Sequence, residues 1–220
     1  MRVTFDDVRN SSEIRTYITQ ADASLVALGF TEHSFAHVGR CAQVAADILT
    51  RLGHSDREIE LCRIAAFMHD IGNVVNRVDH AQSGAVMAFR ILDKMGMEPA
   101  EVATVVTAIG NHDEHTAYPV NAVAAALILA DKTDVRRSRV RNQDMINFDI
   151  HDRVNYAVEH SDVLLDTDEK TITLTLSINT QVCAVMDYFE IFLQRRLLCR
   201  KAAEFFALTF RLEINGQLLL

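Results

Sequence analysis

The sequence has few of the residues that interrupt a compact helical domain. It also lacks the patterns that mark a membrane-spanning segment. Its 220 residues include two prolines and no tryptophan, and no Pro/Gly-rich or low-complexity segment marks a linker. No run of about 18 apolar residues occurs, so no segment is expected to span a membrane. The first residues lack the apolar core of a signal peptide. With 49% hydrophobic and 24% charged residues, we expect a soluble globular protein of one domain, with room for a small appendage.

Cysteine pairs and excess positive charge are also missing. The chain has no Cys-x-x-Cys motif; its four cysteines are scattered through apolar helical patterns, at Cys41, Cys62, Cys183 and Cys199. We therefore expect buried free thiols in a reducing compartment, the cytoplasm. The net charge of −8 argues against nonspecific binding to nucleic acid or to an anionic membrane surface.

Helical periodicity dominates the first 140 residues. Apolar residues recur at helical spacing, with Ser, Thr or Pro at several starts and Gly after several ends, which predicts helices over residues 11–28, 31–52, 55–68, 79–95, 98–109 and 119–130. Ser55 and Glu58 have the spacing of a capping box. The run from Val123 to Ala130 has no polar face and is predicted to be the central buried helix.

The pattern changes beyond about residue 145. Residues 149–159 predict a short helix, and the segments 163–165 and 171–178 predict a β-hairpin, the second by its strict alternation of Thr with apolar residues. A long helix follows from Thr180 to about Leu208, and then residues 209–220 around Asn215-Gly216 predict another hairpin. We expect a mainly α protein: a helical metal-binding domain at 1–145, and an extension at 146–220 with a small antiparallel sheet and one long helix packed on it. An exposed part of the extension could form a homodimer; burial within the subunit is the alternative.

Metal-ligating residue types recur at the ends of these helices. His69 and Asp70 are adjacent at the end of an apolar helix, just before Gly72. Imidazole nitrogen and carboxylate oxygen both bind divalent metals, although one such pair is weak evidence by itself. Four more residues of these types lie in predicted helices or at helix ends: His37, His80, His112 and Asp131. A carboxylate at the end of a buried helix needs a partner, which for Asp131 is a metal or a salt bridge to Lys132, Arg136 or Arg137.

The order His…His-Asp…Asp resembles the HD-domain superfamily of metal-dependent phosphohydrolases. The matching stretches are residues 37–45, 68–72 and 129–132, and the resemblance covers roughly residues 30 to 140. It implies a helical bundle with one metal held by His37, His69, Asp70 and Asp131. His80 and His112 resemble the extra ligands of two-metal members, in which Asp70 would bridge the ions.

One loop departs from the HD-GYP branch of this superfamily. Where that branch reads His-His-Glu, this chain has Asn111-His112-Asp113-Glu114, and only Tyr118-Pro119 remains of the Gly-Tyr-Pro. The departure puts cleavage of cyclic di-GMP in doubt. His115 competes with His112 for the role of ligand.

Several residues are candidates for contact with a substrate. Lys132, Arg136 and Arg137 follow Asp131, and guanidinium groups suit bidentate binding of phosphate; a solvated charged face is the alternative. His33 shares a helix face with His37 and is expected at the rim of the site. Asp79 could hold the second nitrogen of His80, or could be an ordinary acidic residue at a helix start.

The resemblance implies a metal-dependent phosphohydrolase that acts on a phosphoester of a nucleotide or related small molecule through a metal-bound hydroxide, with Asp70 and Lys132 as catalytic residues. Mixed imidazole and carboxylate ligands suit divalent transition metals, here two ions of Fe, Mn, Zn, Co or Ni. Two alternatives remain: a diiron oxygenase of the same fold, and a non-catalytic nucleotide-binding signalling module.

Overall fold

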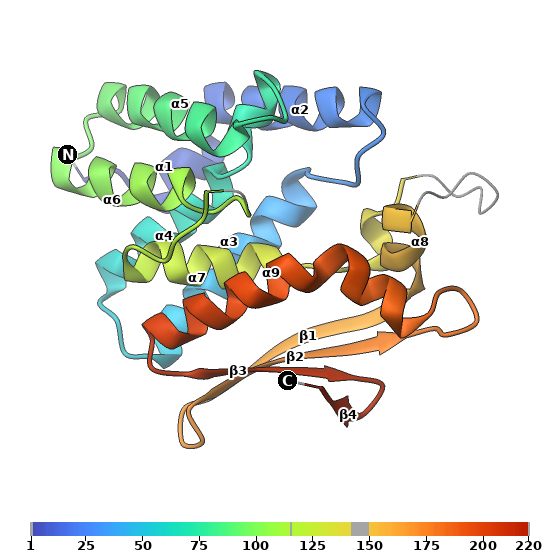
Figure 1. Ribbon diagram of the computed structural model, residues 1–220. Helices are drawn as coiled ribbons and strands as arrows, with labels where there is room; N and C mark the ends of the chain where they lie inside the picture. Colours follow the sequence, from blue (N-terminus) through green and yellow to red (C-terminus); the bar gives the residue numbers. More distant parts are fainter. Residues whose placement is uncertain (1, 115, 142–149, 220) are drawn as a thin grey trace.

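The computed structural model describes residues 2–114, 116–141 and 150–219 (Figure 1). Helices form most of the chain, and a small sheet lies along one side of them, which confirms the expected fold class. The helical part contains α1 (Phe5–Asn10), α2 (Ser12–Ala27), α3 (Phe35–Arg51), α4 (Asp56–Met68), the 3-10 turn η1 (Ile71–Val74), α5 (His80–Lys94), α6 (Pro99–Gly110), α7 (Ala122–Lys132) and η2 (Arg137–Arg139). The predicted domain boundary at residue 145 lies outside the described residues.

Local capping explains where these helices begin. The Ser11 hydroxyl accepts the Ile14 amide at the start of α2, and Ser55 and Glu58 form the predicted capping box of α4. Two helices begin later than the sequence pattern predicted, because a better cap lies further along the chain. Ser34 caps α3 and Asn121 caps α7.

The short helix α1 was not predicted from the sequence. Thr4 and Asp7 form its capping box, and Phe5 and Val8 are buried. Its six residues are too few to show a helical period.

Helix α7 is the centre of the core, as its unbroken apolar sequence predicted. Every residue from Val123 to Ala130 is buried, and α3, α4, α6 and α9 pack around the helix. The last turn of α7 therefore carries Asp131 and Lys132 into the interior.

The C-terminal part consists of α8 (Ile150–Ala157), β1 (Val158–Asp166), β2 (Thr171–Ile178), α9 (Val185–Phe205), β3 (Thr209–Ile214) and β4 (Gln217–Leu218). Both predicted hairpins are present, since β1 pairs with β2 and β3 with β4 in antiparallel fashion. The prediction of a wholly antiparallel sheet was wrong, because β2 and β3 are parallel. Helix α9 connects them, and parallel neighbours require a crossover of this kind. The helix begins at Val185 rather than near Thr180.

Helix α9 lies between the sheet and the helical part (Figure 1). On one side it packs against β3, and on the other against α7, where the buried Arg196 donates a hydrogen bond to the Lys132 carbonyl. The extension and the helical part consequently share one hydrophobic core. All four cysteines are buried and free, as expected.

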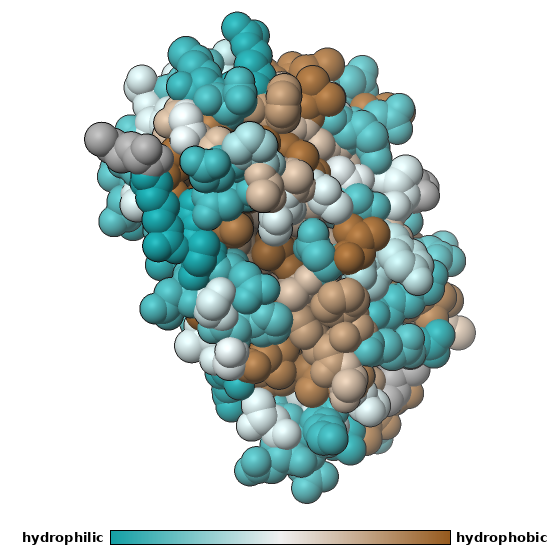
Figure 2. Space-filling model, turned by 90° about the vertical axis from the view of Figure 1, so that its left-hand side faces the viewer, coloured by the Kyte–Doolittle hydropathy of each residue, from teal (hydrophilic) through white to brown (hydrophobic). Residues whose placement is uncertain are grey.

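The surface mixes apolar and hydrophilic residues. Seen from the left of Figure 1, apolar side chains gather in a band across the middle of the face, with hydrophilic ones around them (Figure 2). Met186, Leu193 and Phe205 of α9 are exposed, and the homodimer stays a prediction. Within the described ranges, no helix combines the length and the hydropathy needed to cross a membrane.

Candidate metal centre

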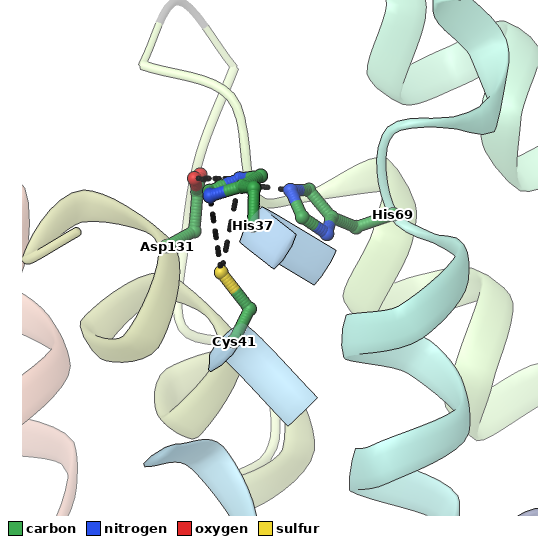
Figure 3. Close-up of side chains that lie close together, drawn as sticks. All are labelled: His37, Cys41, His69 and Asp131. Carbon is green, nitrogen blue, oxygen red and sulfur yellow. Dashed lines mark hydrogen bonds and ion pairs between the residues drawn. The ribbon is translucent and has the colours of Figure 1, made fainter. Parts of the chain in front are cut away.

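Three helices bring four predicted ligands together in the interior. His37 lies in the first turn of α3, His69 follows the end of α4, and Asp131 lies in the last turn of α7 (Figure 3). Asp70 is the residue after His69. His37 Nε2 is 3.3 Å from Asp131 Oδ1 and 3.6 Å from Asp70 Oδ2. His69 Nε2 is 3.2 Å from Asp70 Oδ2 and 3.8 Å from Asp131 Oδ1. The four side chains thus converge on one point.

A second group of imidazoles lies on the other side of Asp70. His80, the first residue of α5, has its Nε2 3.5 Å from Asp70 Oδ1 and 3.2 Å from His112 Nε2. Asp70 therefore faces two groups at once, with Oδ2 toward His37 and His69 and Oδ1 toward His80. This is the arrangement expected of a bridging carboxylate. The competing candidate His115 lies outside the described residues.

All four imidazoles make a hydrogen bond through Nδ1, and this bond fixes the orientation of each ring in the same way. His69, His80 and His112 each donate from Nδ1 to the carbonyl three residues earlier: Ala66 at 2.8 Å, Arg77 at 3.0 Å and Ile109 at 2.6 Å. His37 Nδ1 lies 2.7 Å from Asp134 Oδ2. When Nδ1 carries the proton, Nε2 keeps the lone pair that a metal needs.

Asp79 does not hold His80, which corrects one of the two interpretations of this residue. Its backbone is left-handed (φ 56°), and its side chain makes no capping hydrogen bond. The Arg77 carbonyl accepts the hydrogen bond from His80 instead.

The chemistry of this donor set fits a divalent transition metal. His69 Nε2 and Asp70 Oδ2 are buried without a hydrogen-bond partner, and such atoms are rare in proteins unless something binds them. Burial lowers the pKa of His112 well below its ordinary value, so the ring is neutral. Burial would raise the pKa of Asp131, but the Lys132 ammonium, the hydrogen bond with His37 and the charge of His69 together hold that pKa well below its usual range. The site thus combines a neutral imidazole with a charged carboxylate.

Gly72 lets α5 approach Asp70. A Cβ atom at this position would lie 2.0 Å from the His80 carbonyl oxygen and 2.5 Å from the Gly84 nitrogen. Only glycine allows η1 and the first turn of α5 to come this close. The Asn73 amide holds Asp70 from the other side, with Nδ2 2.9 Å from both the Asp70 carbonyl and Oδ1.

A chain of alternating charges leads from the ligands to the C-terminal helix. Lys132 Nζ lies 2.7 Å from Asp131 Oδ2 and 3.1 Å from Glu114 Oε2, and Glu114 Oε1 lies 2.5 Å from Arg195 Nε. Burial would raise the pKa of Glu114, but the charges of Lys132 and Arg195 hold it well below its ordinary value. The sequence left open whether Asp131 would pair with Lys132, and this salt bridge is present.

Arg136 and Arg137 are not brought to the cluster. Arg136 binds Asp134 with Nε at 2.5 Å and Nη2 at 3.0 Å. Arg137 donates to the Tyr156 carbonyl at 2.6 Å, and both arginines line a different surface hollow, next to β1. The structure thus corrects their expected position: nearby acceptors turn both guanidinium groups away.

A cavity of about 390 Å³ contains the predicted rim residue His33 and reaches residues that contact the cluster. Arg77, on its wall, has Nη1 3.4 Å from His80 Nε2 and 4.0 Å from Asp70 Oδ1. The remaining lining residues come largely from the loop after α2 and from the C-terminal extension: Leu28, Gly29, Phe30, Thr31, Arg139, His151, Asp152, Asn155, Phe192 and Arg195.

Asp134 and Arg195 were not predicted from the sequence as residues of the site. Asp134 follows Asp131 by three residues, so a second carboxylate near a ligand was a usable signal. Arg195 is far along the chain on another helix and left no local signal. Cys41 lies one turn after His37, with Sγ 3.6 Å from Nδ1 (Figure 3), and burial raises the pKa of its thiol well above the usual value.

Comparisons with known proteins place most of these residues within one family match. Residues 34–136 match the model of the HD domain family. An uncharacterized protein of Methanocaldococcus jannaschii is 23% identical over an alignment of 203 positions that covers 82% of this chain and 78% of that protein. Ribonuclease Y of Cutibacterium acnes is 29% identical over 109 residues, 50% of this chain but only 19% of the ribonuclease.

The crystal structure of a predicted HD superfamily hydrolase from an uncultured Thermotogales bacterium superposes with a TM-score of 0.46 at 30% identity, over 56% of this chain and 67% of that one. The family match includes His37, His69, Asp70, His80, His112 and Asp131. Through residues 34–136, the chain belongs to the HD-domain family.

Proposed function

We propose that this protein is a metal-dependent phosphohydrolase that hydrolyses a phosphoester of a nucleotide or related small molecule. The observation that carries the proposal is the position of Asp70, whose Oδ2 faces His37 and His69 while its Oδ1 faces His80. His37, His69, Asp70 and Asp131 would hold one divalent ion. His80 and His112 would hold a second, with Asp70 shared between the two.

When bound, such ions would polarise a phosphoryl oxygen and lower the pKa of water. The chain's own residues supply the rest. The Asp134 carboxylate and three backbone carbonyls keep the imidazoles oriented. Burial would lower the pKa of Lys132, but Asp131 and Glu114 raise it above its ordinary value, so its ammonium stays charged and can balance charge on a phosphate.

The adjoining cavity favours a small substrate. Its volume of about 390 Å³ is near the lower end of the range for ligand sites, about 300–1,000 Å³. The free, buried cysteines favour a reducing compartment, and we propose the cytoplasm.

Metal analysis followed by an activity screen tests the proposal. The protein is purified without chelators or a metal-affinity tag, its metal content per chain is measured, and phosphoesters are screened with and without oxygen. About two transition-metal ions with oxygen-independent release of phosphate would support it. Substrate turnover that needs iron and consumes oxygen would favour the oxygenase. A protein that takes up no Mn, Fe, Zn or Ni would overturn catalysis and favour the nucleotide-binding module.

A further inference from the structure

The cavity beside the metal centre is more positive than the protein around it. Three arginines line it, Arg77, Arg139 and Arg195, against the single carboxylate of Asp152. The chain as a whole carries a net charge of −8. A positive hollow on an acidic protein attracts anions toward that one place.

Two of these arginines each lie near an aromatic ring. Arg77 lies 5.7 Å from the centroid of the Phe30 ring, and Arg195 lies 5.1 Å from that of Phe192. Both rings line the same cavity. Each guanidinium thus lies within cation–π range of an aromatic ring, and this contact lowers the entropy lost on binding a ligand.

Arg195 also has binding capacity left. Among the described residues its one ion-pair partner is Glu114, which it meets through Nε. Its side chain is 31% exposed. The terminal nitrogens can therefore still donate to a planar or tetrahedral oxyanion.

We propose that Arg195 of α9 and Arg77 form the anion-binding subsite of this centre, and that Phe30 and Phe192 contact the organic part of the ligand. This inference rests on the proposed phosphohydrolase function and deepens it. It makes the preferred substrate a phosphate monoester with a compact apolar or aromatic group. It also makes the C-terminal extension a wall of the substrate site.

The test is calorimetric titration of inorganic phosphate and of phenyl phosphate into the 220-residue chain loaded with Mn²⁺. Arg195→Gln should weaken binding of both ligands by about tenfold, the range of one charged hydrogen bond, with unchanged manganese content. Arg200→Gln is the matched control, because Arg200 lies on the same helix and pairs with Glu204 at the surface. Phe30→Ala should weaken phenyl phosphate and leave inorganic phosphate unchanged.

Glu114→Gln separates direct contact from a structural effect. If Arg195 acts only by holding Glu114, this variant should weaken phosphate binding as Arg195→Gln does. If Arg195 binds the anion, removing its competing carboxylate should leave phosphate binding equal or tighter. Wild-type affinity in Arg195→Gln, or an equal loss in Glu114→Gln, would overturn the inference alone. A wild-type chain that takes up no manganese would overturn the proposed function as well.

Discussion

The carboxylate of Asp134 lies 2.7 Å from Nδ1 of His37, across 97 residues of sequence. Asp134 is itself held by Arg136, and Arg40 Nε lies 3.3 Å from its other oxygen. An acidic partner of this kind orients a metal-binding imidazole and raises its basicity. Arg136, expected at the substrate, therefore acts on the centre through Asp134.

Asp134→Asn should lower the affinity for the ion at His37 by about 10- to 100-fold, because the amide cannot orient and polarise His37 as a carboxylate does. Competition with a chromogenic chelator measures the change. Asp93→Asn, at an exposed position of α5, is the control. Unaltered metal affinity would show that Asp134 serves only to neutralise its arginines.

Single ligand replacements should remove different numbers of metals. Asp70→Ala should lose both ions, since its two oxygens face both groups of imidazoles. His112→Ala should lose one and keep the ion at His37. Elemental analysis of each purified variant counts the ions. If His115→Ala loses one ion and His112→Ala keeps both, the second ligand has been assigned to the wrong histidine.

Gly72→Ala should destabilise the protein, because its Cβ would overlap backbone atoms of α5. Overpacking of this kind costs about 1–3 kcal/mol or more. Gly39→Ala should act in the opposite direction: Gly39 lies within α3, nothing is within 4 Å of its Cβ position, and alanine is preferred over glycine in helices by about 1 kcal/mol. Urea unfolding of both variants measures whether the free energy of unfolding falls for Gly72→Ala and rises for Gly39→Ala. If the two variants had the same free energy of unfolding, this result would show that η1 and α5 can move apart without a cost in stability.

Removal of metal should lower the melting temperature. A ligand present at 100 times its dissociation constant stabilises the folded state by about 2.7 kcal/mol, and chelation withdraws that contribution. Adding Mn or Zn back should restore the melting temperature more fully than Mg, which prefers all-oxygen sites. Asp70→Ala should show no response to either treatment. A chelator-insensitive wild-type protein would argue that the cluster holds no metal.

The positions of most helices were predictable because their signals are local. A capping box at Ser55, proline at the start of α6 and the unbroken apolar run of α7 depend only on neighbouring residues. The two hairpins were equally local, one marked by alternation and the other by Asn215-Gly216. The late starts of α3 and α7 show the limit of such signals, because several residues near each start could serve as the cap.

The candidate ligands could be listed from the sequence because the order His…His-Asp…Asp survives as a pattern of residue types. That order says nothing about which oxygen of Asp70 faces which imidazole. Asp70 can face imidazoles with both of its oxygens because α5 approaches closely at Gly72. That approach is a contact between two elements of structure, so no local sequence pattern shows it.

The sequence by itself determined the helical class, the buried central helix and the residues that could bind a metal, since each depends on composition and short spacing. Only the tertiary structure decided that β2 and β3 are parallel, that Arg136 and Arg137 turn away, and that Arg195 lines the cavity. These facts depend on how α9 packs between the sheet and α7, which joins residues more than 60 positions apart. Burial and charge pairing across such distances are properties of the folded chain, and no local pattern carries them.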